Sequence, residues 1–313
     1  MPINNAIIQV AAASHGNTIA ARTPERLGGL GRLIAHKSIL VDAPHRFLVE
    51  GSWCRQTRSV ELDVPEMERG NAALLSLNRL HFEARRRPGG LVWFDHEGIP
   101  ADQIVECCYL NGFEILSADA AARADADAAG VAVGNADGGL LLRVFETAPS
   151  TLRMGARLLV VGINPSPMSA SMGIPFGRKG NRFWPGMLAS GACTLDRDPL
   201  DLVRVGGIAM TDISKRVTRR ADELSREEIR EGYLRLERMV RWLRPQAVAI
   251  LGVTTWRIAR ADPSVALGLQ SQTLGDCEVW VLPNPSGLNA HTSVEDFSNR
   301  INECLRSPTS SAF

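Results

Sequence analysis

The sequence predicts an α/β protein whose C-terminal domain is a three-layer α/β/α sandwich around a four-stranded parallel sheet. From about residue 158 onward, short apolar runs rich in β-branched residues alternate with longer segments of helical periodicity. The first run, residues 158–161, is apolar at every position, which is typical of a strand buried on both faces of a parallel sheet. Together these observations predict helices on both faces of the sheet.

Length and composition indicate two domains. The chain has 313 residues, of which 45% are hydrophobic and 22% charged, as in ordinary globular proteins. We expect a smaller N-terminal domain at 1–150, of α+β or α/β type and unknown function, and a second domain at 151–313. A stretch of Ala, Asp and Gly at about 118–139 predicts a linker near the end of the first domain.

Composition also disfavours several classes of protein. The formal net charge of +1 provides no overall attraction to nucleic acid, so such a role requires a local basic face. No apolar run is long enough to span a membrane and none has the form of a secretory signal, which predicts a cytoplasmic protein. The six cysteines form no Cys-x-x-Cys pair, so we expect reduced thiols and neither a zinc site nor an iron–sulfur cluster. We also expect a monomer.

The first 150 residues contain elements but no recognisable chemistry. Strands are predicted at 38–41, 46–50 and 58–64, and a helix at 65–87 opens with proline in a permitted first-turn position. Strands at 91–94 and 113–116 flank a helix at 100–110, which predicts a βαβ unit, and a last strand follows at 140–145.

A polar residue follows the first strand of the second domain. Gly162 permits a sharp turn, and Pro165 disfavours helix at Asn164. Asn164 is therefore expected at the carboxyl end of a central strand, where open α/β sheets bind ligands. By itself this pattern indicates only a strand and an Asn-Pro turn.

A loop and a helix follow this turn. Residues 166–173 are small and predict a loop, and Asn181 is the expected N-cap of a helix to about residue 190. Between them, Phe176 lies in a proline- and glycine-rich loop. A rigid loop bearing one aromatic ring can supply a stacking surface for a planar base, although Phe176 taken alone would more commonly belong to a core.

The remaining strands are predicted at 206–210, 247–251 and 279–282. A capping box of Ser225 and Glu228 begins a helix that ends before Pro245, and a final amphipathic helix occupies about 294–305. The second strand leads into a basic loop that includes Arg219 and Arg220. This loop is either a solvated surface or a clamp on a nucleic-acid backbone.

The fourth strand runs into a second Asn-Pro turn, at Asn284. The two turns together are specific: residues 158–306 resemble the mismatch-specific uracil/thymine DNA glycosylases of the uracil-DNA glycosylase superfamily. One signature is Gly-Ile-Asn-Pro at 162–165, continuing through Pro-Phe at 175–176 to Asn-Arg-Phe-Trp at 181–184. The other is Leu-Pro-Asn-Pro-Ser-Gly-Leu at 282–288. The likeness covers about half the chain.

The resemblance implies an α/β/α sandwich and a monofunctional DNA repair glycosylase without cofactors. Such an enzyme hydrolyses the N-glycosidic bond of uracil, and of thymine or ethenocytosine as further substrates, opposite guanine in double-stranded DNA. The base must be flipped out of the helix at a cost of about a few kcal/mol, and G·U or G·T mispairs lose less pairing energy than a matched pair. The N-terminal domain is a candidate for extended DNA contact or for a protein partner.

The resemblance also assigns roles to residues. Asn164 holds the attacking water, since an amide can position water without being a strong base. Leu288 is the wedge that enters the space left by the base, and Gly287 and Asn289 offer main-chain contacts to the orphaned guanine. The base pocket consists of Ile163, Ser169, Phe176 and Asn284. Charge and loop position predict phosphate contacts at Arg178, Lys179, Lys215 and Arg216. The resemblance implies that Ser286 also lies near the phosphates of the flipped nucleotide.

The chain departs from the family pattern at several positions. Ser166 replaces the usual glycine and Pro167 an aliphatic residue, which can narrow substrate choice. Asp212 stands where relatives often have Lys or Asn, and it could either repel phosphate or polarise the attacking water. Asn284 replaces the histidine of other branches, which predicts slower chemistry because no imidazole stabilises the leaving anion. Two alternatives remain: a glycosylase for hypoxanthine or single-stranded uracil, and a protein that binds uracil-DNA without cutting.

Overall fold

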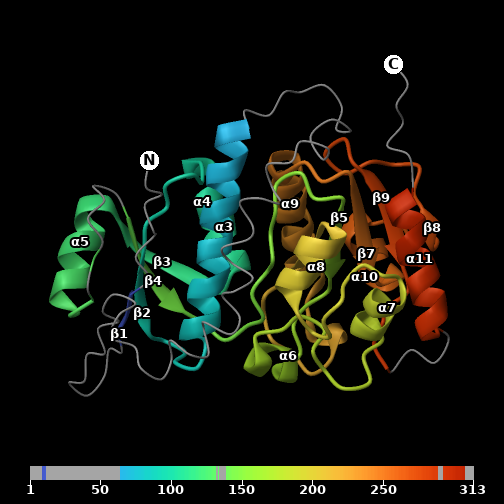
Figure 1. Ribbon diagram of the computed structural model, residues 1–313, viewed down its shortest axis with the longest axis horizontal. Helices are drawn as coiled ribbons and strands as arrows, with labels where there is room; N and C mark the ends of the chain where they lie inside the picture. Colours follow the sequence, from blue (N-terminus) through green and yellow to red (C-terminus); the bar gives the residue numbers. More distant parts are fainter. Residues whose placement is uncertain (1–8, 12–63, 132, 134–138, 288–291, 307–313) are drawn as a thin grey trace. The chain divides into compact units, whose positions relative to one another are not determined.

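The computed structural model describes residues 9–11, 64–131, 133, 139–287 and 292–306. Their contacts divide the chain into two compact units, one from 1–99 and 113–145 and the other from 100–112 and 146–313. The strands predicted at 38–41, 46–50 and 58–64 lie outside the described residues, except that Val64 begins helix α3 (Val64–Ala84). Figure 1 gives the order of the elements along the chain.

The first unit is built on a four-stranded antiparallel sheet. Its strands are β1 (Gln9–Ala11), β2 (Leu91–Phe94), β3 (Phe113–Ala118) and β4 (Leu140–Val144), in the order β1-β2-β4-β3. The strands expected at 91–94, 113–116 and 140–145 are therefore confirmed. The helix expected at 65–87 is confirmed as α3. The predicted βαβ unit differs from the structure: β4 lies between β2 and β3 and pairs antiparallel with both, and the connecting helix at 101–110 belongs to the second unit.

The segment predicted as a linker begins with a helix, α5 (Asp119–Ala128). Ala122 and Ala126 are fully buried and pack with Trp93 and Leu141. They lie four residues apart and therefore share one face of the helix. Composition predicted a loop or linker with a partly helical start, and the buried alanines pack this helical start against Trp93.

The second unit confirms the predicted parallel sheet. Strands β5 (Leu158–Gly162), β6 (Ile208–Asp212), β7 (Ala247–Leu251) and β9 (Glu278–Leu282) pair in parallel in the order β6-β5-β7-β9. A short fifth strand, β8 (Gly268–Leu269), adds antiparallel to β9 and was not predicted. It contains only two residues, too few for a period-2 pattern.

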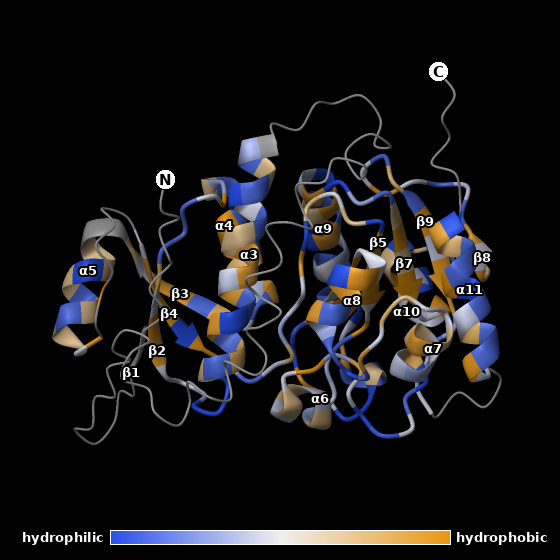
Figure 2. Cartoon of the chain, in the orientation of Figure 1, coloured by the Kyte–Doolittle hydropathy of each residue, from blue (hydrophilic) through white to orange (hydrophobic). Residues whose placement is uncertain are grey.

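Alternate side chains of the central strand separate the sheet's two faces. Leu159 and Val161 join a buried cluster with helices α9 (Arg226–Leu243) and α10 (Val253–Arg260). Leu158 and Val160 join another, with α7 (Phe183–Ala189), α8 (Pro199–Gly206) and α11 (Val294–Arg306). This alternation makes a three-layer sandwich, and Figure 2 shows hydrophobic strands β7 and β9 beside helices with hydrophilic outer surfaces.

Two helices of this unit were not predicted. The small-residue loop at 166–173 contains α6 (Pro167–Met172), with Ser166 as its N-cap. Helix α8 begins after Asp198, whose side chain accepts hydrogen bonds from the amides of Leu200 and Asp201. Both helices begin with proline after a capping side chain, a start signal that their short length obscured.

Helix α4 (Ala101–Leu110) belongs to the second unit although it lies between two strands of the first in sequence. It contacts α9, and Glu106 forms ion pairs with Arg235, at 3.3 Å, and with Arg238. Within the described part of the chain, no helix has the length and apolarity needed to cross a membrane.

Gly232 offers a test of the packing between α9 and β6. A β-carbon at this position would lie 2.2 Å from the carbonyl oxygen of Ile213, just beyond β6. Gly232→Ala is expected to lower the free energy of unfolding by about 2 kcal/mol because backbone cannot move aside cheaply. Helix propensity alone would favour alanine by about 1 kcal/mol, so a gain in urea resistance would contradict the prediction. Glu231→Ala, on the exposed face, is the control and should change stability by less than about 0.5 kcal/mol.

Candidate active site

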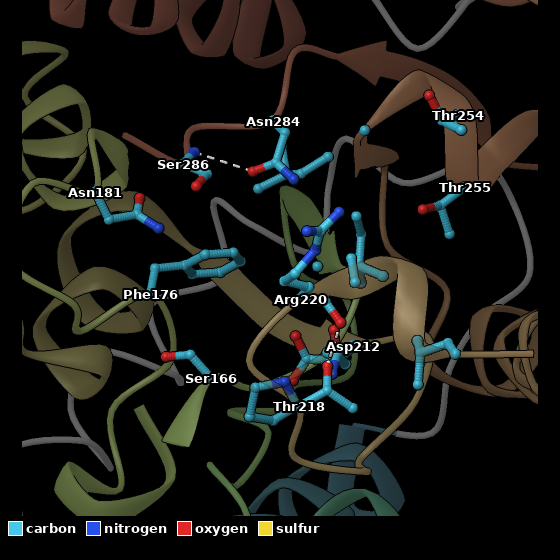
Figure 3. A pocket seen from close by; sticks show the side chains of 18 of the residues that line it. Ser166, Phe176, Asn181, Asp212, Thr218, Arg220, Thr254, Thr255, Asn284 and Ser286 are labelled. Atoms are coloured by element: carbon cyan, nitrogen blue, oxygen red, sulfur yellow. Dashed lines mark hydrogen bonds between the residues drawn. The ribbon is translucent and has the colours of Figure 1, made fainter. Parts of the chain in front are cut away.

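A cavity of about 1120 Å³ opens at the carboxyl ends of the parallel strands. The residues that line it come from all four strand ends and the loops that follow, which is where α/β sheets bind ligands. Predicted site residues among them are Ile163, Asn164, Ser169, Phe176, Arg178, Asn284 and Ser286. Figure 3 shows the Phe176 ring, in this view, between the Asn284–Ser286 loop and Asp212.

The side-chain amide of Asn164 is held in one orientation. Its Nδ2 donates to the carbonyl oxygen of Arg216 at 2.8 Å and to Oγ1 of Thr218 at 2.7 Å. A backbone carbonyl can only accept, so the group facing Arg216 must be the NH₂. Because both amide hydrogens have acceptors, the carbonyl oxygen is the remaining hydrogen-bonding group of the Asn164 side chain, and Asn164 lines the cavity.

Thr218 completes this arrangement and was not singled out from the sequence. Its hydroxyl donates to the carbonyl oxygen of Arg220 at 2.6 Å, which leaves an oxygen lone pair directed to the Asn164 amide. Its own backbone N–H donates to the carbonyl of Pro165 at 3.2 Å. The loop after β6 therefore lies against the turn after β5. The role of Thr218 becomes visible only through these hydrogen bonds between the loop and the turn.

Gly162 permits a close approach of two other groups of the cavity. A β-carbon there would lie 2.4 Å from Oδ1 of Asp212 and 2.9 Å from Cζ of Phe176. Gly162 and Asp212 are register partners at the ends of β5 and β6. The carboxylate and the tip of the aromatic ring thus meet over a residue that has no side chain.

The second oxygen of Asp212 forms a buried ion pair. Oδ2 accepts from Nζ of Lys215 at 2.8 Å, and the two side chains are 5% and 0% exposed. Burial lowers the pKa of Lys215, while the nearby carboxylate opposes this change by favouring the charged amine. The prediction that Lys215 contacts phosphate is wrong, because its amine is turned into the protein and has no exposed surface.

Phe176 presents an aromatic surface to the cavity. Its ring stacks on Phe183 with centroids 4.2 Å apart and an angle of 21° between the planes. Its backbone φ is +56°, a left-handed conformation that is unusual for a bulky residue and is typical of functional loops. The adjacent carbonyl of Pro175 accepts from Nε1 of Trp184 at 2.8 Å. Phe183 covers one face of the Phe176 ring, so a ligand can stack only on the other.

The departures at Ser166 and Pro167 have a structural explanation. Ser166 caps α6 by accepting from the amide of Ser169 at 3.2 Å, and Pro167 occupies the first helical turn. The Ser166 hydroxyl also donates to that of Ser169 at 3.1 Å. The two departures therefore start a helix that places the buried Ser169 hydroxyl in the wall of the cavity.

Backbone contacts join the two sequence signatures. The amide of Arg182 donates to the carbonyl of Pro285 at 2.8 Å, and its guanidinium donates to the carbonyl of Ser286 at 3.0 Å. A β-carbon on Gly287 would lie 2.7 Å from the carbonyl oxygen of Gly180. Gly287 is exposed beside this junction, whereas Leu288 and Asn289 lie outside the described residues.

The predicted phosphate contacts differ in their surroundings. Arg178 is exposed and lines the cavity, and Lys179 is exposed beside it in sequence. Arg216 is also exposed, but its guanidinium binds Glu228 at 2.6 Å. The structure adds further arginines to the lining: Arg219, Arg220, Arg226 and Arg300.

With Arg178 these make five arginines against three aspartates in the lining, so the cavity wall is net positive. Arg219 and Arg220 were noted in the sequence as a basic loop, but Arg226 and Arg300 were missed. Their only signals are indirect: Arg226 follows the capping residue Ser225, and Arg300 lies one turn after the buried Phe297.

The described cysteines are buried free thiols that do not line the cavity. Burial raises the pKa of Cys108, Cys277 and Cys304 to about 12 in each case. These thiols are therefore protonated near neutral pH and are poor nucleophiles. Chemistry in the cavity must depend on its amides, hydroxyls, carboxylates and arginines.

A comparison with protein-family models assigns the second half of the chain to a family. The model of the Uracil DNA glycosylase superfamily matches residues 149–306, about half of the chain. The chain belongs to the uracil DNA glycosylase superfamily. Membership makes it a DNA glycosylase that acts on uracil-type damaged bases. The matched region contains β5–β9 and nearly all of the residues that line the cavity.

The buried ion pair generates a prediction about stability. Asp212→Asn removes the partner of a buried ammonium and is expected to lower the free energy of unfolding by about 3–5 kcal/mol near pH 7. The loss should shrink as pH rises through the lowered pKa of Lys215 toward its unfolded value of about 10.4, because a neutral amine needs no counter-ion. Urea unfolding between pH 7 and 10 measures this trend.

The control is Glu237→Gln, which breaks a surface pair with Arg241 and should cost less than about 1 kcal/mol. An Asp212→Asn protein that is no less stable than this control, or whose deficit grows with pH, would contradict the prediction.

Proposed function

We propose that this glycosylase hydrolyses the N-glycosidic bond of uracil mispaired with guanine in double-stranded DNA, by a monofunctional reaction that leaves an abasic site. The observation that carries the proposal is the fixed amide of Asn164. Its two hydrogens are occupied by Arg216 and Thr218, so its carbonyl oxygen is available to accept a hydrogen bond from a water in the cavity. A positioned water is what hydrolysis of a flipped nucleotide requires.

In the proposed reaction, the water oxygen forms a bond to C1′ of the deoxyribose as the bond from C1′ to N1 of uracil breaks. The electron pair of the broken bond leaves with uracil. The amide of Asn164 orients the water but cannot take its proton, because a neutral amide is a very weak base. We assign the proton to the carboxylate of Asp212, whose Oδ1 lies over Gly162 on the neighbouring strand.

The base pocket is proposed from the same wall. Phe176 offers the free face of its ring to the flipped base, and Ser169 offers a buried hydroxyl. On the opposite side of the cavity, Asn284 is oriented because its Oδ1 accepts from the amide of Ser286 at 2.9 Å (Figure 3). From this position we propose Asn284 as a further contact of the flipped base.

Preference for a duplex substrate rests on the loop after β9. Arg182 holds this loop through the carbonyls of Pro285 and Ser286, next to the segment proposed as wedge and guanine contact, 287–289. Arginines in the cavity lining, together with the exposed Arg178 and Lys179, supply the positive charge that DNA phosphates require. A G·U mispair is the proposed target because it is more easily opened than a matched pair.

The function is tested with the full chain on labelled oligonucleotides that contain G·U, G·T, A·U or single-stranded uracil. Alkali cleavage after incubation reports abasic sites, and G·U should be processed fastest. Asn164→Ala should lose roughly a hundredfold or more in excision rate while binding G·U duplex normally. Equal rates on all uracil substrates would refute mispair selectivity, and tight uracil-dependent binding without any cleavage would identify a binding protein.

Orientation of the Asn164 amide is tested at Thr218. Thr218→Val keeps the shape but removes the acceptor, and the single-turnover excision rate should fall roughly tenfold, the effect of one lost hydrogen bond at the reacting centre. Thr218→Ser keeps the hydroxyl and should restore the rate to within about threefold of the original. If valine and serine variants are equally active, Thr218 does not orient Asn164.

A further inference from the structure

Helix α4 lies far from the family-matched residues in sequence but packs among them. Its residue Glu106 binds Arg235 and Arg238 of α9, and the guanidinium carbon of Arg235 lies 4.1 Å from the centre of the Tyr109 ring. The carbonyl of Leu110, at the end of α4, accepts from the amide of Ser150 at 3.0 Å. These contacts hold α4 and the segment before β5 in one compact unit.

The same two segments bind Lys215 on three of its polar groups. Its backbone N–H donates to the hydroxyl oxygen of Tyr109 at 3.1 Å. Its backbone carbonyl accepts from Oγ1 of Thr147 at 2.9 Å, and its amine donates to the carbonyl of Ala148 at 2.9 Å. All three partners precede residue 149, where the family match begins.

Lys215 lies between the two groups that face the proposed water. Its amine holds the carboxylate of Asp212, and the next residue, Arg216, supplies the carbonyl that fixes the amide of Asn164. Strand β6 ends at Asp212, so the buried backbone of Lys215 has no strand partner and needs acceptors and donors from elsewhere. Tyr109 and Thr147 meet that need.

We propose that α4 and residues 147–148 are positioning elements of the glycosylase reaction, with Tyr109 as the residue that sets the loop at 212–218. The inference rests on the proposed function, because it assigns to these residues the placement of Asn164 and Asp212. The functional unit thus begins before the family domain, and it includes a helix contributed by the N-terminal half of the chain.

The test is Tyr109→Phe in the full chain, which removes only the hydroxyl. The single-turnover excision rate on G·U duplex should fall roughly three- to tenfold, as for one lost hydrogen bond. Affinity for duplex with a non-hydrolysable 2′-fluorinated deoxyuridine should stay within about twofold, because Tyr109 does not line the cavity. Hydrogen exchange of the peptide spanning 211–218 should become faster.

Tyr233→Phe is the matched control, since Tyr233 is the other tyrosine of the chain and its hydroxyl accepts from Arg260, away from the loop. This variant should keep the original excision rate and the original exchange at 211–218. Thr147→Val, which removes the donor to the Lys215 carbonyl, is measured in the same way and decides the matter if Tyr109→Phe fails to fold.

An original excision rate in both Tyr109→Phe and Thr147→Val would overturn the proposal, as would a rate loss matched by an equal loss of DNA affinity. If the unmodified protein releases no base from any oligonucleotide, the proposed function fails instead. Hydrogen exchange would then still report whether Tyr109 holds the loop.

Discussion

The parallel pairing of β5 with β6 is the interaction on which the site depends. Register places Gly162 beside Asp212, and the pairing continues past the strands through hydrogen bonds from the amides of Ile213 and Ser214 to the carbonyls of Gly162 and Ile163. This extension brings the carbonyl of Arg216 and the hydroxyl of Thr218 to the amide of Asn164. A polar side chain at a strand end becomes an oriented group because the neighbouring loop fixes it.

A buried ion pair lies within this arrangement. Asp212 and Lys215 are both buried, and each would be costly without the other. Pairing leaves one carboxylate oxygen of Asp212 facing Gly162 and Phe176 in the cavity. The amine of Lys215 also donates a hydrogen bond to the carbonyl of Ala148. A residue just before the family domain therefore helps to hold the ion pair beside the cavity.

On the opposite side of the cavity, hydrogen bonds to backbone carbonyls hold the loop. In the loop after β9, the backbone carbonyls of Pro285 and Ser286 accept hydrogen bonds from Arg182. Arginine suits this task because its planar group offers several donors in fixed directions. The loop that bears the proposed wedge is thereby tied to the loop that bears Phe176, and the two signatures of the sequence form one site across the sheet.

The sequence by itself determined the parallel sheet and the two Asn-Pro turns, because buried strands and proline turns are local patterns of residue type. It ended the second strand at residue 210, whereas β6 continues to Asp212. It also located Asn164, Phe176 and Asn284 at one edge. It misplaced Lys215, since a lysine in a basic loop looks exposed until a buried carboxylate three residues away is seen to bind it. The roles of Thr218 and Tyr109 depend on contacts 54 and 106 residues apart in the chain, which no local pattern encodes. Only the tertiary structure brought those groups together.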